Sequence, residues 1–452
     1  MRAETPPRIV AVGVDTLMLS WQAETPAGVF SRCEELRKIA EEMHRTHDPA
    51  PLCVDLGERT FIVSGRYPRP PFRWMWHSDC GRFILKLSPS ERPKGTPAVM
   101  VESSALGLWS MGWGNWVDEA RDLAQAAVTD PENGDAPAIR EERVARLDLA
   151  VDMQGGEPWT GSDLEVRRLL CRAGSHRNGE QTQDGKKRPA LPLFVSHGAP
   201  NTPGFTGYEF GGGGPVKGRI YDKVKEIRKS QKYWMQEVWK RRGWDPDGPN
   251  VWRVEVQLRR AACKALGLDT FEPGRLDRAW RWFAGYPAQL GWRACGGWLS
   301  LRDPRGDRNR SRWPVSDLWR AYQGAEFCDA LAIPGIRDRW DADEEKRALA
   351  QIQGYAAALC AIRGIRPDCG AFVCEACKEA HGPPHCPECP GCGKVQLRAA
   401  LEVVEGNLTA AVFGERLAIA RKRRGAAALR WAVRPITDAA LKAALEGPDA
   451  SA

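Results

Sequence analysis

A tyrosine followed two positions later by a lysine is the most reactive combination of residue types in this chain. Tyr221 and Lys223 lie in the stretch RIYDK, residues 219–223. A phenol has an ordinary pKa of about 10, so it attacks phosphorus near neutral pH only with help from a base or a cation. If both residues lie on one strand face, Lys223 would stabilise the phenolate or the phosphate. Together with acids that bind a cation, the pair would suit phosphoryl transfer with a tyrosine nucleophile.

Carboxylates that could hold a cation for this chemistry lie in two further stretches. Asp148 and Asp152 belong to RLDLAVD (146–152), and Glu255 belongs to WRVEVQLR (252–259). Carboxylate oxygens are the ligands that hard cations such as Mg²⁺ or Mn²⁺ prefer. Four strand residues span about 13 Å. Unless the strand bends or bulges, one of the two aspartates must therefore orient a neighbouring group instead.

The three stretches share a pattern that places their polar side chains together. Polar and apolar residues alternate in 146–152, 219–223 and 252–259, which predicts half-buried strands with opposite faces. If the strands share a sheet, its polar face collects the tyrosine, the acids and several basic groups. Taken singly, each strand also fits an ordinary solvated edge. The seven histidines form no His-x-His pair within a strand, so the acids remain the candidate metal ligands.

A glycine run precedes the tyrosine strand. Gly211 to Gly214 separate two expected strands within 208–221 and lack the Lys-Ser/Thr of a phosphate-binding loop, so they predict a hairpin. Tyr208 lies on the first of these strands and is a second candidate nucleophile.

Composition indicates a globular protein of more than one domain. The chain has 452 residues, 42% hydrophobic and 27% charged, and no run approaches the roughly 18 apolar residues of a membrane helix. The N-terminus lacks the layout of a signal peptide, so we expect a cytoplasmic protein with no membrane partner. The net charge of +8 includes basic clusters at 228–229, 240–242 and 421–424. Each cluster fits either a polyanionic partner or a solvated surface.

Six of the fourteen cysteines crowd between positions 369 and 392. Two Cys-x-x-Cys knuckles at short spacing predict a closed tetrahedral Zn²⁺ site. Its ligands would come from Cys374, Cys377, Cys386, Cys389 and Cys392, with Cys369, His381 and His385 as possible substitutes. A closed site gives no open position for zinc chemistry, so the metal is expected to be structural. A contact of this zinc ribbon with DNA or another partner is the alternative.

These motifs resemble the Rep_trans replication initiation factors, which start rolling-circle replication of small plasmids and some phages. The resemblance rests on 146–152, on RIYDKVKE (219–226) and on WRVEV (252–256), in the family's order, and covers residues 9 to about 325. It departs from the family in the glycine-rich stretch before Tyr221 and does not explain the cysteine cluster. The resemblance implies that Tyr221 is the nucleophile; Lys223 matches the same motif.

The resemblance implies a DNA-nicking protein. Tyr221 would attack an origin phosphodiester, leaving a 5′-phosphotyrosine and a free 3′-hydroxyl. The DNA would be single-stranded or extruded, and Arg219, Arg253 and Arg259 would hold its phosphates; pairing with the acids is their alternative role. A host helicase and a second copy of the chain are further partners that the residues do not specify.

The expected fold class is α+β. A curved, mainly antiparallel sheet with flanking helices would form a nicking domain over 1–265, completed by a helical region over 266–365. The zinc ribbon would follow at 366–396 and a basic helical tail at 397–452. Two alternative functions stay open: a relaxase of a conjugative or integrative element, with the same chemistry, and a non-catalytic zinc-ribbon DNA-binding regulator.

Overall fold

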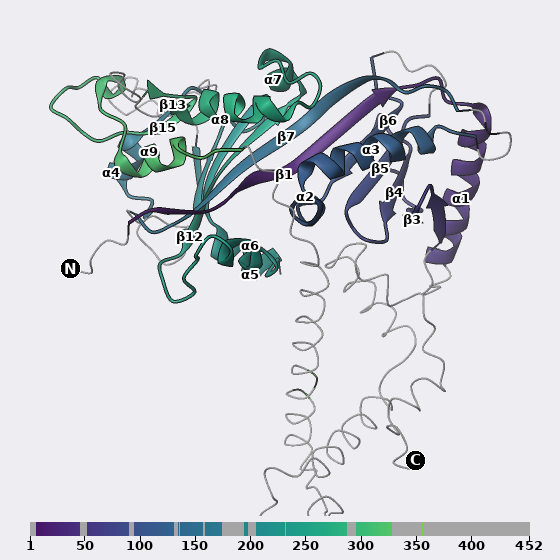
Figure 1. Ribbon diagram of the computed structural model, residues 1–452, viewed down its shortest axis with the longest axis horizontal. Coiled ribbons are helices and arrows are strands. Elements are labelled where there is room, and N and C mark those ends of the chain that lie inside the picture. Colours follow the sequence, from purple (N-terminus) through teal and green to yellow (C-terminus); the bar gives the residue numbers. More distant parts are fainter. Residues whose placement is uncertain are drawn as a thin grey trace, which may run out of the picture. The chain divides into compact units, whose positions relative to one another are not determined.

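A computed structural model of the chain describes most of its first 327 residues. The described residues are 6–45, 52–89, 95–130, 134, 136–156, 159–173, 194–197, 205–230, 232–286, 295–327, 352 and 355. Within them, an antiparallel sheet of eleven strands in the order β2-β3-β4-β5-β6-β1-β7-β12-β11-β10-β9 organises the fold (Figure 1). The predicted α+β class with a mainly antiparallel sheet is confirmed.

Two long central strands join the halves of this sheet. β1 (Arg8–Gln22) and β7 (Arg140–Gln154) have 15 residues each and pair along their length. At about 3.3 Å per residue each spans about 50 Å, which lets one end carry the first half and the other end carry the second. Residues 8–22 form one continuous strand.

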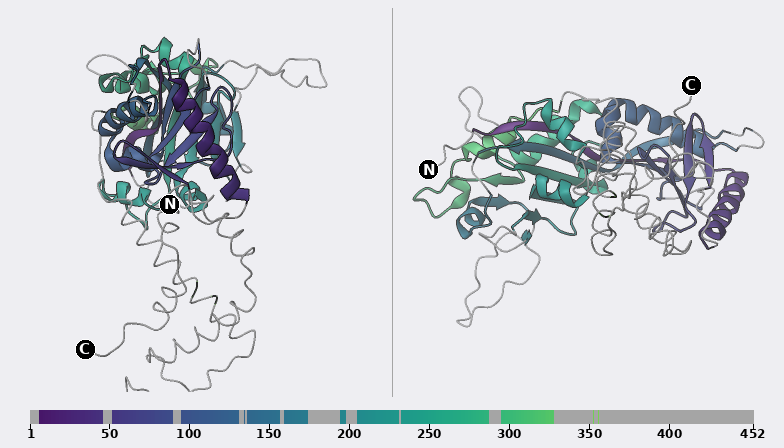
Figure 2. Two further views of the ribbon diagram at one scale, coloured as in Figure 1. Left: turned by 90° about the vertical axis from the view of Figure 1, so that its right-hand side faces the viewer. Right: turned by 90° about the horizontal axis from the view of Figure 1, so that it is seen from below.

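The first half is a meander covered by helices. It consists of β2 (Cys53–Leu56), β3 (Arg59–Val63), β4 (Trp74–Ser78), β5 (Phe83–Leu87) and β6 (Val99–Ser103), with α1 (Ala27–Arg45), α2 (Ala105–Met111) and α3 (Trp113–Ala127). Alternate strand residues are buried: Phe83 stacks on Trp116 of α3, and Trp74 stacks on Phe30 of α1. Figure 2 shows α1 lying across the strands of this half.

The second half carries the three alternating stretches as neighbours. Beside β7 lie β12 (Val251–Arg259), β11 (Val216–Asp222), β10 (Gly207–Phe210) and β9 (Phe194–His197). β10 and β11 form the hairpin that the glycine run predicted. The added helices are α4 (Asp163–Arg168), α5 (Lys223–Ser230), α6 (Met235–Lys240), α7 (Arg260–Ala265), α8 (Leu276–Ala284) and α9 (Asp317–Gln323), with the 3-10 helices η1 (Pro273–Arg275) and η2 (Arg310–Arg312).

Serine caps begin three of these helices. Ser104, Ser162 and Ser316 accept hydrogen bonds from backbone N–H groups in the first turns of α2, α4 and α9. Such a cap satisfies a donor that the helix itself leaves unpaired.

The region after residue 265 contains short strands as well as the predicted helices. β13 (Gly285–Tyr286) pairs with β14 (Cys295–Gly296), and β15 (Leu299–Leu301) pairs with β8 (Leu169–Cys171). The predicted zinc ribbon and basic tail lie outside the described residues.

Register puts the polar positions of the second half on one face. Arg219 of β11 is opposite Glu255 of β12, and Gln257 of β12 is opposite Asp148 of β7. Side chains of directly opposed residues point to the same side of a sheet. In β1, the pairing shifts by one residue between Val14 and Thr16, so Asp15 occupies a β-bulge beside Asp148.

Candidate active site on the polar face of the sheet

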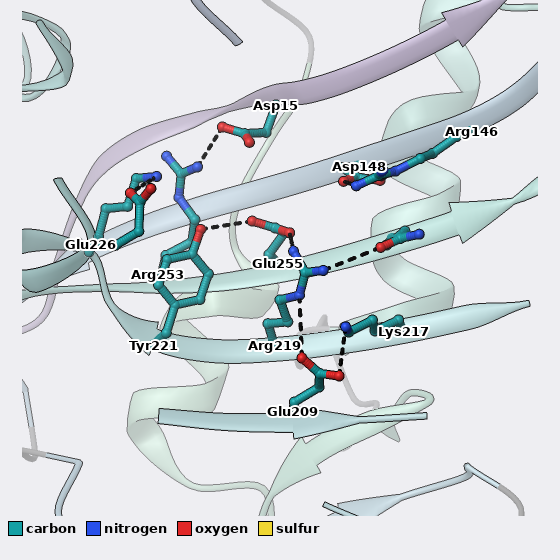
Figure 3. Close-up of polar contacts among 12 residues, drawn as sticks. Asp15, Arg146, Asp148, Glu209, Lys217, Arg219, Tyr221, Glu226, Arg253 and Glu255 are labelled. Atoms are coloured by element: carbon teal, nitrogen blue, oxygen red, sulfur yellow. Dashed lines mark hydrogen bonds and ion pairs between the residues drawn. The ribbon is translucent and has the colours of Figure 1, made fainter. Parts of the chain in front are cut away.

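A hydrogen bond between a tyrosine and a glutamate lies at the centre of this face. The Tyr221 hydroxyl donates to Oε2 of Glu255 at 2.8 Å, and Nη1 of Arg219 donates to Oε1 at 2.7 Å (Figure 3). Glu255 has 3% of its side chain exposed, whereas Arg219 keeps 31% exposed. The Glu255 carboxylate therefore accepts the hydrogen bond of the phenol on one oxygen, and a guanidinium orients it through the other.

The surroundings of Tyr221 keep its hydroxyl protonated at rest. Burial raises the pKa of Tyr221 well above its ordinary value, and the negative charge of Glu255 raises it further. A neutral phenol is a weak nucleophile, so reaction requires a proton acceptor at the moment of attack. Glu255 already lies within hydrogen-bonding distance of that proton.

Lys223 is near Tyr221 but not on its strand. β11 ends at Asp222, and Lys223 is the first residue of α5, because the Asp222 carboxylate accepts from the backbone N–H of Lys225 at 3.0 Å and caps the helix. The prediction of a shared strand face was wrong. The buried Lys223 ammonium lies 5.6 Å from the centre of the Tyr221 ring and pairs with Glu226 at 2.6 Å. Burial lowers the pKa of Lys223, and the nearby Arg253 lowers it further.

Asp148 lies beside these residues, in surroundings that disfavour its negative charge. Its carboxylate accepts from Nε of Arg146 at 2.8 Å, yet its pKa is raised to about 7. Burial is the main cause, and the charges of Glu255 and Asp15 add to it, against the opposing effect of Arg146. Negative charge is thus concentrated here beyond what the neighbouring cation offsets.

Asp152 and Arg253 do not face the pocket, contrary to their predicted roles. Both side chains are 0% exposed, and Nε and Nη2 of Arg253 donate to the two oxygens of Asp152 at 2.5 and 2.9 Å. Trp239 of α6 donates to the same carboxylate at 2.8 Å. Neither side chain lines the pocket, so Asp152 is not placed to ligate a cation there and Arg253 is not placed to reach a DNA phosphate.

Asp15 connects this buried pair to the pocket. Nη1 of Arg253 donates to Oδ1 of Asp15 at 2.5 Å. Burial opposes ionisation of Asp15, but the charges of Arg253, Lys223 and Lys232 hold its pKa well below the ordinary value. The sequence analysis missed Asp15, although an acid within the apolar strand VAVGVDTLML (10–19) was a signal that could have identified it.

These side chains border a pocket of about 340 Å³. The charged lining residues are Asp15, Arg146, Asp148, Glu209, Arg219, Lys223, Glu226, Lys232 and Glu255, and the uncharged ones are Thr16, Tyr208 and Tyr221. The lining acids have basic partners, as in the pair Glu209–Lys217 at 2.6 Å. Within the described part of the chain, no three His, Cys, Asp or Glu side chains are grouped to hold a metal ion by themselves.

The remaining candidates take no part in the contact between Tyr221 and Glu255. Tyr208 also lines the pocket, but it is opposite Ile220 in the register, and its buried hydroxyl donates to Glu165 at 2.6 Å, where burial raises its pKa. Its ring packs against Phe205 and Trp159. Arg259 is exposed at the end of β12, so its phosphate contact stays a prediction.

The zinc prediction cannot be placed on this structure. Its five cysteine ligands, Cys374, Cys377, Cys386, Cys389 and Cys392, lie outside the described residues. Among the helices that the structure describes, none combines the length and apolar character needed to cross a membrane.

The chain is similar to a solved structure. The structure of the rolling circle replication initiator protein from Geobacillus stearothermophilus aligns with 71% of this chain and 96% of that chain, at 14% sequence identity and a TM-score of 0.35. No protein-family model matches the chain, and no curated protein matches its sequence.

Proposed function

We propose that the chain is a metal-dependent DNA strand transferase that nicks one strand at an origin through Tyr221. The observation that carries this proposal is the hydrogen bond from the Tyr221 hydroxyl to the buried Glu255 carboxylate at 2.8 Å. A nucleophile, a proton acceptor and half-exposed basic groups share one pocket there. These are the parts that in-line attack on a phosphodiester requires.

In the proposed reaction, the Tyr221 oxygen forms a bond to phosphorus while the bond from phosphorus to the 3′-oxygen breaks. The phenol proton passes to Oε2 of Glu255, and the departing 3′-oxygen takes a proton from water. The products are a 5′-phosphotyrosine and a free 3′-hydroxyl, the primer for rolling-circle synthesis. Since a phosphodiester is exchanged for a phosphotyrosine, the reverse attack by a 3′-hydroxyl reseals the strand.

Arg219 and Lys223 would assist this step from two sides. Arg219 lies two residues before Tyr221 on β11 and is partly exposed, so it would contact a non-bridging phosphate oxygen while orienting Glu255. Lys223 lies close to the Tyr221 ring and would stabilise the negative charge that develops on the phenol oxygen.

A divalent cation would be held by Asp148 and Glu255 together with phosphate oxygens of the DNA. The donor chemistry fits, since Mg²⁺ is commonly bound by one or two carboxylates plus substrate phosphates. The raised pKa of Asp148 supports this assignment, because it indicates negative charge that a cation would relieve. The bound cation would polarise the scissile phosphate. Asp152 would take no part, since it does not line the pocket, as Asp148 and Glu255 do.

The test is formation of a covalent adduct. The wild type, Tyr221→Phe and the matched control Tyr208→Phe would be incubated with supercoiled DNA from the region that encodes the chain, with Mg²⁺, Mn²⁺ or EDTA. Denaturing gels would then separate free DNA from protein–DNA adducts. We expect metal-dependent nicking and an adduct with the wild type and Tyr208→Phe, and neither product with Tyr221→Phe.

Other outcomes would change the assignment. An adduct that persists in Tyr221→Phe but disappears in Tyr208→Phe would move the nucleophile to Tyr208. Tight binding without nicking by the wild type would favour the non-catalytic regulator. A relaxase would give the same adduct, and the position of the nick, at a transfer origin or a replication origin, would distinguish the two.

A further inference from the structure

The helices that follow the nucleophile strand carry a dense positive charge, and the proposed reaction uses only Lys223 of it. Residues 223–242 contain eight basic and two acidic residues, a net charge of +6 in a chain whose total is +8. The basic residues exposed here are Arg228, Lys229, Lys240, Arg241 and Arg242, which we call the α5–α6 basic surface. Figure 1 shows both helices on the same side of β12.

This surface is continuous with the pocket. α5 begins two residues after Tyr221; its first residue, Lys223, and Lys232, which follows its end, both line the pocket. Arg8, at the start of β1, donates to the carbonyl oxygen of Gly243 at 2.5 Å and adds a further guanidinium beside Arg242. A phosphate chain leaving the pocket along α5 would therefore remain in contact with positive charge.

Buried contacts hold the surface rigidly against the site. Trp239 of α6 is 0% exposed and donates to Asp152, whose other contacts lead through Arg253 to Asp15 at the pocket edge. This packing also explains why α6 forms, since isolated helices of six residues are unstable in water.

Helix stabilisation accounts for only part of the charge. Basic residues in a last helical turn interact favourably with the helix dipole, and Arg228, Lys229 and Lys240 lie in the last turns of α5 and α6. Arg241 and Arg242 follow the helix, are exposed, and have no acidic partner among the described residues. Two neighbouring exposed guanidinium groups without an acidic partner, as at Arg241 and Arg242, are the electrostatic signature of a polyanion contact.

We infer that the α5–α6 basic surface binds the backbone of duplex DNA flanking the nicked strand; the inference rests on the proposed function of the Tyr221 pocket. Binding of single strands depends on aromatic rings on which bases stack. Trp234 and Trp239 of this region are buried and Tyr233 is half-buried, so the surface offers mainly charge rather than stacking. Duplex DNA carries one charge per about 1.7 Å of axis, which suits such a surface.

The test measures binding of the full chain to a labelled 20-base-pair duplex and to a single strand of equal length between 50 and 300 mM salt. The variant is Arg241→Gln/Arg242→Gln. Its matched control is Arg66→Gln/Arg69→Gln, which neutralises two exposed arginines between β3 and β4. Loss of two phosphate contacts should lower the slope of log K against log salt by about 1.8 and weaken duplex binding about 10- to 100-fold at 0.1 M salt.

Single-strand affinity, adduct formation on a single-stranded oligonucleotide and the control variant should all stay near wild type. An unchanged duplex slope would overturn the inference, as would an equal loss in the control. An equal loss on the single strand would overturn the assignment to duplex DNA. A wild type that forms no adduct but shows the expected duplex effect would refute the proposed nicking and leave this surface assignment standing.

Discussion

The two halves of the sheet use the same strand alternation for different chemistry. In the second half, the face with Tyr221 carries charged side chains whose hydrogen bonds link neighbouring strands, as from Arg219 to Glu255. Register continues this face across the central strands into the first half. The corresponding positions there are occupied by Met75, His77, Ile84, Met100 and the ion pair Lys86–Glu102.

The ion pairs of the two halves differ in how far they are buried. Lys86 and Glu102 each keep 20% of their side chains exposed, so their 2.6 Å pair retains hydration. Arg253 and Asp152 have no exposure at all, and burying two charges costs free energy that only close pairing offsets. Within its described residues, the first half of the sheet folds without a fully buried ion pair on this face. The buried Arg253–Asp152 pair beside Tyr221 is therefore best explained by the chemistry of the pocket.

The largest contrast is expected from removing one cation in each half. Arg253→Ala leaves Asp152 buried without its guanidinium, and should lower the free energy of unfolding by about 3–5 kcal/mol. Lys86→Ala breaks a partly hydrated pair and should cost about 1 kcal/mol. Denaturant unfolding of both variants measures the difference.

A second variant separates charge from packing at this position. In Arg253→Met/Asp152→Leu, both buried charges are removed, so part of the lost stability should return. Equal destabilisation by Arg253→Ala and Lys86→Ala would contradict the contrast between the halves. An Arg253→Met/Asp152→Leu protein no more stable than Arg253→Ala would show that the guanidinium acts mainly through its packing.

Alternation in the sequence was enough to place Tyr221, Arg219 and Glu255 on one face, and the register confirms it. Alternation also places Arg253 and Glu255 on the same face of β12. It therefore could not show that Glu255 lines the pocket whereas Arg253 does not. Arg253 is buried because α6 brings Trp239 over that end of the strand, and such packing is not written in local periodicity.

Two other features also depended on information that alternation lacks. Asp15 reaches Arg253 across 238 positions of sequence through a β-bulge, which period-2 patterns do not encode. Lys223 was placed on a strand because its spacing from Tyr221 fitted one. The side chain of Asp222 instead caps a helix at that point, a choice decided by one local hydrogen bond.

The next largest effect is expected on the nicking rate, when Glu255 of the second half or Glu102 of the first half is replaced by glutamine. Glu255→Gln keeps the size of the side chain but removes the proton acceptor for Tyr221, so the nicking rate should fall about 10²- to 10³-fold. Glu102→Gln should leave the rate within about twofold of wild type, since Glu102 pairs with Lys86 away from the pocket. Single-turnover adduct formation measures both. A Glu255→Gln protein with wild-type rate would exclude Glu255 as the proton acceptor.

Two glycines allow a smaller comparison of backbone constraint. Gly207 has φ of +143°, and an added Cβ would come 2.1 Å from the carbonyl oxygen of Ile220 and 2.7 Å from Cα of Tyr221. Gly207→Ala should therefore cost about 2–3 kcal/mol and displace the nucleophile strand. Gly57, in the turn between β2 and β3, has φ of +59° and nothing within 4 Å, so Gly57→Ala should cost about 1 kcal/mol. Unfolding free energies and adduct rates test both, and equal losses of stability would contradict the close approach at Gly207.

The smallest expected contrast is in how stability depends on pH. Because the folded pKa of Asp148 is raised to about 7 from 3.8, its contribution to stability is complete below pH 3.8 and is lost as pH rises through 7. Burial lowers the pKa of His77 below 6.5, so its contribution is present above pH 6.5 and is lost as pH falls. In EDTA, Asp148→Asn should gain stability relative to wild type between pH 5 and 8, and His77→Gln should gain relative to wild type as pH falls below 6.5. If both variants shifted in the same direction, the opposite charge environments of the two halves would not be supported.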